Sequence, residues 1–160
     1  MSNPAENLKE KFKKEKIRIT QVIRKLKKNT PRDLDYRFQE LHDEAFSQID
    51  CLNCANCCKT TSPILLEKDI ERLSQHLKIR PGEFITKYLF LDTDNLYAFK
   101  SVPCPFLGAD NYCTVYEFRP KACREYPHTN QRKMHTLLNL AEKNAEICPA
   151  VFHILKRFAE

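Results

Sequence analysis

Apolar residues recur at helical spacing within the first fifty residues, a stretch that contains no cysteine. One stripe lies within residues 8–26, and a second steps by three or four positions from residue 34 to residue 49. The stripes consist of Leu8, Phe12, Ile19, Val22, Ile23 and Leu26, and of Leu34, Phe38, Leu41, Ala45 and Ile49. Between them, Thr30 can cap a helix and Pro31 suits its first position. The pattern therefore predicts two amphipathic helices joined as an antiparallel hairpin.

The remaining residues alternate short apolar stretches with prolines. Helices are expected over residues 66–77 and 84–91, and the best strand candidate covers residues 96–102. Residues 103–130 hold four prolines, so long regular elements are not expected there. A polar helix over about residues 131–146 should precede a terminal helix that docks on the core. The apolar residues of that last helix are Val151, Phe152, Leu155 and Phe158.

Charge and composition exclude several classes of protein. The formal net charge is +6, and residues 1–30 hold ten Lys and Arg against three Glu. Nucleic acid or an anionic membrane could bind such an arm, but no base-reading motif accompanies it, which favours a solvated helix face. No apolar run is long enough to span a bilayer, and residues 1–16 lack a signal-peptide core, so a cytoplasmic location is expected. Two glycines in 160 residues exclude a glycine-rich phosphate loop.

The eight cysteines are the feature that carries chemistry. In a reducing cytosol such thiols are typical of metal binding or catalysis rather than of disulfides. The first four follow the pattern C-x2-C-x2-C-C, in which three thiols at helical spacing can face one centre and the adjacent fourth diverges. Zinc and iron–sulfur sites both complete such a group of three thiols, here called the hook, with a cysteine that is remote in the sequence. The candidate ligands are Cys51, Cys54, Cys57, Cys58, Cys104, Cys113, Cys123 and Cys148.

Other polar residues near the cysteines allow two interpretations. Arg119 and Arg124 flank Cys123. They can offset thiolate charge by hydrogen bonding to the ligand sulfur atoms, or they can form ion pairs with nearby glutamates. Among five scattered histidines, His128 is the best spare ligand, although no metal-type spacing supports it. No Ser-His-Asp order and no H-E-x-x-H motif indicates a hydrolase.

Two blocks of residues resemble the CxxCxxCC cysteine-cluster family (YkgJ type). The first block is Cys51–Cys58, and the second runs from Cys104-Pro-Phe-Leu through Cys113-Thr-Val-Tyr to Arg119-Pro-Lys-Ala-Cys123-Arg-Glu-Tyr-Pro. The resemblance covers about residues 50–130, with Cys148 as a last member. Because that family is described as zinc- or iron-chelating, the resemblance implies bound metal. A similar cluster occurs in flagellin lysine-N-methylases, which are longer chains.

The leading hypothesis is a metal-binding protein that holds zinc or iron, the latter also as an iron–sulfur cluster, through its eight cysteines. The alternative is a metalloenzyme acting on a protein substrate, for which no catalytic residue and no protein partner can be named. Eight thiols allow two four-cysteine sites, one polynuclear site, or one site together with cysteines that bind no metal. The expected fold is mainly α, with a helical hairpin over residues 1–48. That hairpin should pack on an irregular, metal-stapled core with little β structure over residues 49–160. At least one remote cysteine is expected to complete the hook of Cys51, Cys54 and Cys57.

Overall fold

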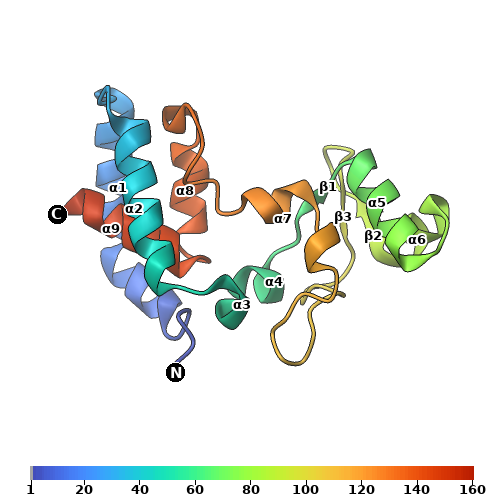
Figure 1. Cartoon of the computed structure of the whole chain (residues 1–160). Helices are drawn as coiled ribbons and strands as arrows, with labels where there is room; N and C mark the ends of the chain where they lie inside the picture. The colour runs from blue at the N-terminus through green and yellow to red at the C-terminus, as the bar shows by residue number, and fades with distance from the viewer. Residues whose placement is uncertain (1) are drawn as a thin grey trace. The chain divides into compact units, whose positions relative to one another are not determined.

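A computed structural model of the chain describes residues 2–160 (Figure 1). The chain forms two compact units. Unit 1 comprises Met1–Cys54 and Pro127–Glu160, and unit 2 comprises Ala55–Tyr126. The structure is mainly helical with one small sheet, which confirms the predicted fold class. The predicted division into a hairpin extension over residues 1–48 and a cysteine-cluster domain over residues 49–160 stays a prediction.

Unit 1 is a helical assembly organised around its last helix. It contains α1 (Leu8–Lys28), α2 (Leu34–Gln48), the short α3 (Cys51–Cys54), the 3-10 helix η2 (Met134–Thr136), α8 (Leu138–Asn144) and α9 (Pro149–Ala159). Helix α9 packs on both α1 and α2, and α8 packs on α1 and α9. Figure 1 shows α9 in red crossing the blue α1 and the cyan α2. The terminal helix therefore docks on the core as predicted.

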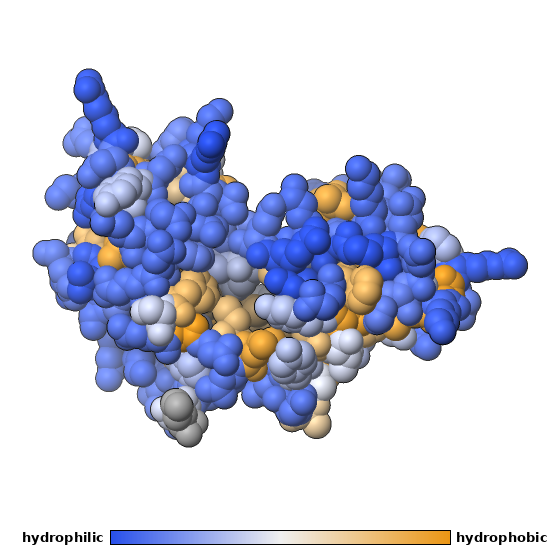
Figure 2. All heavy atoms as spheres, in the orientation of Figure 1, coloured by the Kyte–Doolittle hydropathy of each residue, from blue (hydrophilic) through white to orange (hydrophobic). Residues whose placement is uncertain are grey.

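The predicted apolar stripes of α1 and α2 form the buried faces of these helices. Every stripe residue of α1 is buried except Val22, which is half-buried, and α2 buries Leu34, Phe38 and Ala45. The Phe38 ring lies 4.7 Å from the ring of Phe158 on α9, measured between centroids. All ten Lys and Arg of residues 1–30 are exposed, and the visible face of unit 1 is mainly hydrophilic (Figure 2).

Two local expectations in unit 1 are wrong. Thr30 does not cap α2, because its hydroxyl donates instead to the carbonyl oxygen of Leu26 at 3.0 Å, a local bond that competes with capping. The polar helix expected over residues 131–146 is reduced to η2 and α8. The carboxylate of Asp35 accepts the N–H groups of Lys133 and Met134, each at 2.8 Å, and so fixes a turn ahead of η2.

Unit 2 combines short helices with a three-stranded antiparallel sheet. Its helices are α4 (Asn56–Thr60), α5 (Glu67–Leu77), α6 (Pro81–Tyr88), η1 (Tyr116–Phe118) and α7 (Lys121–Glu125), and its strands are β1 (Ile64–Leu65), β2 (Leu89–Leu91) and β3 (Tyr97–Phe99). The strand order is β1-β3-β2, with Ala98 opposite both Ile64 and Phe90. The helix expected over residues 84–91 therefore ends at Tyr88. Pairing with β3 converts the next three residues to strand.

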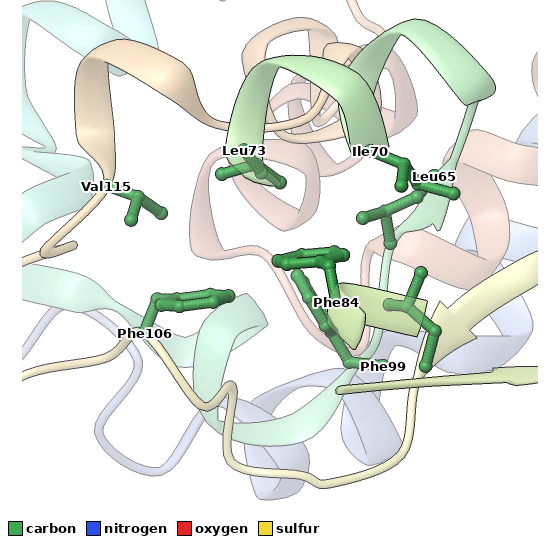
Figure 3. Packing of buried hydrophobic residues seen from close by; sticks show 8 residues of the cluster. Leu65, Ile70, Leu73, Phe84, Phe99, Phe106 and Val115 are labelled. Carbon is green, nitrogen blue, oxygen red and sulfur yellow. The ribbon is translucent and has the colours of Figure 1, made fainter. Parts of the chain in front are cut away.

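One apolar core holds unit 2 together. Its buried residues are Leu65, Ile70, Leu73, Phe84, Leu89, Phe99, Phe106 and Val115. Figure 3 shows Phe84 and Phe106 with their rings facing, and the rings are parallel at 6.3 Å between centroids. Phe106 and Val115 come from the proline-rich region that carries Cys104 and Cys113, and both cysteines pack against this core. Burial of the Phe106 and Val115 side chains therefore anchors the loop that carries the two cysteines.

Within residues 2–160, no helix has both the length and the apolar character needed to cross a membrane.

Candidate metal centre

Four thiols from both cysteine blocks gather in unit 2. Cys58 lies in α4 and Cys123 in α7, while Cys104 and Cys113 flank a tight hairpin. The charges of Cys58, Cys104 and Cys113 all act on the Cys123 thiol, and the charge of Cys58 also acts on Cys104 and Cys113. We call Cys58, Cys104, Cys113 and Cys123 the unit 2 thiol set.

The hairpin between Cys104 and Cys113 fixes the spacing of its two thiols. Leu107 forms a β-bridge with Cys113, and the N–H of Gly108 donates to the carbonyl oxygen of Tyr112 at 2.8 Å. A Cβ at Gly108 would lie 2.7 Å from the Asp110 carboxylate and 3.1 Å from that carbonyl oxygen, so this position favours glycine. The backbone N–H of Cys104 donates to the carbonyl oxygen of Cys58 at 2.7 Å, which ties α4 to the hairpin.

Backbone amides that follow Cys104 and Cys113 in the sequence donate hydrogen bonds to the two sulfur atoms. The N–H groups of Phe106 and Leu107 lower the pKa of Cys104, and the N–H of Val115 lowers that of Cys113. Amide hydrogen bonds to sulfur stabilise a thiolate, and they are also the outer contacts that orient metal-bound cysteines. These amides oppose the larger effect of burial, which raises the pKa values of both thiols.

The pKa values of the unit 2 thiols diverge. The hydrogen bond from the Cys57 side chain lowers the pKa of Cys58 to about 7. The Lys59 charge also lowers this pKa, whereas burial opposes the shift. Burial raises the pKa of Cys104 to about 11 and that of Cys123 to about 12, and neighbouring thiols add to both shifts. Burial also raises the pKa of Cys113. One thiolate forms easily here, and four thiolates together require a compensating cation.

Arg119 provides positive charge beside this thiol set. Its charge lowers the pKa values of both Cys113 and Cys123, opposing the larger effect of burial. The guanidinium carbon lies 3.8 Å from the centroid of the Tyr116 ring, and Nη1 donates to the Tyr116 carbonyl oxygen at 2.6 Å. These contacts fix the position of Arg119, and its role as a charge-compensating residue beside the ligands stays a prediction. Arg124 lies in α7 directly after Cys123.

An ion pair between Arg72 and the buried Asp69, which the sequence does not reveal, fixes the segment that leads to Cys123. The carboxylate of Asp69 is buried and bonds to Arg72 at 2.7 Å, to the N–H of Lys121 at 3.1 Å and to the N–H of Leu66 at 3.0 Å. Arg72 also donates to the carbonyl oxygens of Phe118 and Arg119, at 3.3 and 2.9 Å. The local signal in the sequence is a pair of acidic residues, Glu67 and Asp69, in the first turn of α5, which indicates helix capping and not this long-range role.

Three further thiols belong to unit 1. Cys51 and Cys54 lie one helical turn apart in α3, and Cys148 is the N-cap residue of α9. Cys51 is exposed, whereas Cys54 and Cys148 are buried. Burial raises the pKa of Cys148 to about 12, the amides of Val151 and Ala150 oppose the shift, and the charges of Cys51 and Cys54 add to it. These three cysteines belong to the same unit, and the charges of Cys51 and Cys54 act on Cys148.

The sequence predicts that Cys51, Cys54 and Cys57 face one centre from a helical or turn-rich segment, and the structure places them on two short helices. Helix α3 ends at Cys54 and α4 begins at Asn56, and Ala55 between them has φ 48° and ψ 15°, in the left-handed region. The Cys57 side chain hydrogen-bonds to Cys58. The assignment of all eight cysteines as ligands remains a prediction.

Three of the five histidines have contacts of ordinary structural type. His42 Nδ1 lies 2.8 Å from the Thr129 hydroxyl, and His153 Nε2 lies 3.2 Å from a Glu44 carboxylate oxygen. His76 stacks on Phe118 with 4.0 Å between ring centroids. These positions agree with the interpretation of solvated or packed histidines.

The donor atoms of the unit 2 thiol set fit zinc or iron, since both ions bind thiolate sulfur and are stabilised by surrounding amide donors. All eight cysteines are present as thiols among the described residues. Within residues 2–160, no group of three or more His, Cys, Asp or Glu residues is placed so that it could hold a metal ion.

Comparison with known proteins adds one finding. Residues 50–149, which include all eight cysteines, match the CxxCxxCC family, described as "Putative zinc- or iron-chelating domain". No curated protein and no solved structure matches the chain. Because the matched residues make up more than half of the chain, the protein belongs to the CxxCxxCC family of zinc- or iron-chelating domains.

Proposed function

We propose that this protein binds one zinc or iron ion through the unit 2 thiol set, and that the ion stabilises the irregular part of unit 2. The observation that carries the proposal is the meeting of Cys58, Cys104, Cys113 and Cys123, four residues of three separate segments whose charges act on one another. Four thiolates fill the coordination of zinc, and such closed sites are structural or binding sites rather than catalytic ones.

Electrostatics support a cation at this position. Burial and mutual repulsion hold three of the four thiols protonated, while Cys58 has a pKa of about 7. A divalent ion replaces those protons, and the adjacent Arg119 charge and the amides of Phe106 and Val115 reduce the remaining negative charge. This arrangement would be unfavourable for four thiolates without an ion.

The proposal is tested by metal analysis and absorption spectroscopy of protein purified without oxygen. We expect a bound ion that is lost in both Cys113→Ser and Cys123→Ser, because serine removes one of the four sulfur ligands. Ala122→Ser is the matched control, since it adds the same hydroxyl one residue away and should keep the metal. Metal analysis distinguishes zinc from iron, and iron without acid-labile sulfide indicates a mononuclear iron site.

Two results would change this assignment. Acid-labile sulfide together with iron would show that the thiols hold an iron–sulfur cluster in place of a single ion. Full metal content in Cys123→Ser would show that the unit 2 thiol set is not the site.

A further inference from the structure

Helix α1 concentrates the positive charge of the chain on one exposed surface. Ten of its 21 residues are Lys or Arg and two are Glu, so the net charge of α1 alone exceeds the +6 of the whole chain. All ten basic residues are exposed. Within residues 2–160, only Arg18 of the ten forms an ion pair, with Glu15 at 3.4 Å. The charge of α1 is therefore not balanced by carboxylates of the same chain.

The basic residues lie on both sides of the exposed face of α1. Successive residues of a helix are rotated by about 100° around its axis, which places two rows of three on opposite flanks. The first row is Lys9, Lys16 and Lys27, and the second is Lys11, Arg18 and Lys25. Between the rows lie Glu10, Ile17 and Gln21, together with the other four basic residues. A polyanion that neutralises both rows must therefore pass along both sides of the helix.

The opposite face of α1 is fixed in the core of unit 1. The buried side chains of that face are Leu8, Phe12, Ile19, Ile23 and Leu26. Helix α1 packs on α8 and α9, and the Thr20 hydroxyl donates to the Glu142 carboxylate of α8 at 2.6 Å. A partner therefore meets a helix that is already formed, and binding does not have to order its backbone.

The dimensions of α1 match the major groove of B-form DNA. A helix with its side chains is about 10–12 Å wide, and the groove is about 12 Å wide. The 21 residues span about 31 Å, which is close to one turn of the duplex. The phosphates of the two strands border the groove on its two sides, which is the arrangement that two rows of basic side chains complement.

The same geometry disfavours a membrane as the partner. A helix that binds a bilayer surface inserts an apolar face, and the apolar face of α1 is buried in unit 1. Among the residues of α1, Ile17 is the only large apolar side chain that is exposed, at 74%. A flat anionic surface also cannot contact two opposite flanks of a helix at once.

We propose that the exposed face of α1 binds duplex DNA through its phosphates and independently of base sequence, with the helix along the major groove and one row of basic side chains facing each strand. Binding of this kind needs no base-reading motif, and the sequence shows none. Release of counterions from the phosphates drives it, so the affinity falls as the salt concentration rises. The surface lies outside the unit 2 thiol set and is independent of the proposed metal site.

The test measures fluorescence anisotropy of a labelled DNA duplex two helical turns long, with the full chain and a series of salt concentrations. One variant replaces the three residues of the first row by Gln, and another replaces those of the second row. We expect each to weaken binding about tenfold or more at low salt and to reduce the salt slope by about three. The matched control replaces three exposed lysines of unit 2, Lys68, Lys78 and Lys87, by Gln and should keep the slope. Two duplexes of unrelated sequence should bind equally.

Other polyanions test the identity of the partner. Double-stranded RNA of the same length should bind about tenfold more weakly or less, because its deep, narrow major groove does not admit a helix. Ile17→Ser should leave DNA binding unchanged, whereas it should weaken any binding to phosphatidylserine vesicles. Polyglutamate of the same total charge should compete poorly, because it does not present two parallel rows of charge.

The outcomes decide between these partners. Equal losses in the control and the row variants would show that net charge alone attracts DNA, which overturns the assignment to α1. A loss in only one row variant would overturn the groove orientation. Binding of RNA, vesicles or polyglutamate as tight as that of DNA would overturn the choice of partner. An absence of DNA binding at low salt would refute the inference and leave the proposed metal site standing.

Discussion

The backbone N–H of Cys104 donates a 2.7 Å hydrogen bond to the backbone carbonyl oxygen of Cys58. This bond joins the two cysteine blocks without using either side chain. The position of residue 58 relative to the hairpin therefore does not depend on its sulfur atom. Replacing the thiol should remove a ligand and leave the local backbone in place.

Cys58→Ser should abolish metal binding by the unit 2 thiol set, whereas Cys57→Ser should preserve it. The two cysteines are adjacent, but only Cys58 has its charge acting on Cys104, Cys113 and Cys123. Cys57 instead donates to Cys58, so its loss should raise the Cys58 pKa and weaken binding modestly. Metal content after dialysis against a weak chelator measures the difference. Equal retention in both variants would contradict the assignment.

Asp69→Asn should lower the free energy of unfolding by about 2 kcal/mol, since it leaves Arg72 and two backbone N–H groups without a carboxylate. It should also weaken metal binding, because the segment leading to Cys123 is held by that carboxylate. Urea unfolding followed by circular dichroism gives the first quantity and chelator competition the second. Glu71→Gln, on the same helix and exposed, is the matched control.

The pH dependence of this destabilisation has a defined sign. Burial opposes ionisation of Asp69, but the N–H groups of Leu66 and Lys121 and the Arg72 guanidinium outweigh it and lower its pKa. The contribution of ionised Asp69 to the free energy of unfolding is therefore present above its pKa in the unfolded chain, about 3.9. It is lost as the pH falls through the lower pKa of the folded state. The difference in unfolding free energy between wild type and Asp69→Asn should stay constant from pH 7 to about pH 5 and shrink below about pH 4. A difference that grows on acidification would refute this account.

The helices with a regular apolar period could be predicted from sequence because their buried faces follow local spacing. Phe12, Ile19 and Ile23 lie on one face of α1, and Ile70 and Leu73 do so on α5. The strand β2 could not be predicted in this way. Leu89, Phe90 and Leu91 fit the helical pattern that starts at Phe84, and only pairing with β3 makes them a strand.

For the candidate site, the identity of the cysteines was evident from sequence, but their grouping was not. A repeat of three residues suggests one face only if the helix continues, and the left-handed conformation of Ala55 breaks it between Cys54 and Cys57. The partners of Cys58 and Cys148 depend on long-range packing. The same is true of Asp69, whose contact with Lys121 links residues distant in the chain.

Metal affinity of the unit 2 thiol set should rise steeply with pH. Burial raises the pKa values of Cys104, Cys113 and Cys123, so these three thiols are protonated at neutral pH, while Cys58 with a pKa of about 7 is half ionised. Each released proton contributes a factor of about ten per pH unit, so the binding constant should increase by about three orders of magnitude between pH 7 and pH 8.

Competition with a chelator of known pH dependence gives this slope. Proton release into weakly buffered solution provides an independent count. A slope near one would show that the ion does not recruit the protonated thiols.

Removing the metal should unfold the cysteine hairpin of unit 2 before it affects the helices of unit 1. The hairpin is a short loop, held by a few backbone hydrogen bonds, by the burial of Phe106 and Val115 and by the contacts around its thiols. Helix α1, in contrast, buries Leu8, Phe12, Ile19, Ile23 and Leu26 in a core that needs no ion. Structural zinc contributes on the order of 10–16 kcal/mol to small domains, which is comparable to the whole stability of a typical domain.

Hydrogen exchange with and without a strong chelator should therefore show lost protection at the amides of Phe106 and Val115 and unchanged protection within α1. The Cys58→Ser variant should resemble the chelated wild type without any chelator. Unchanged protection at the hairpin amides after verified metal removal would show that the loop folds without the ion.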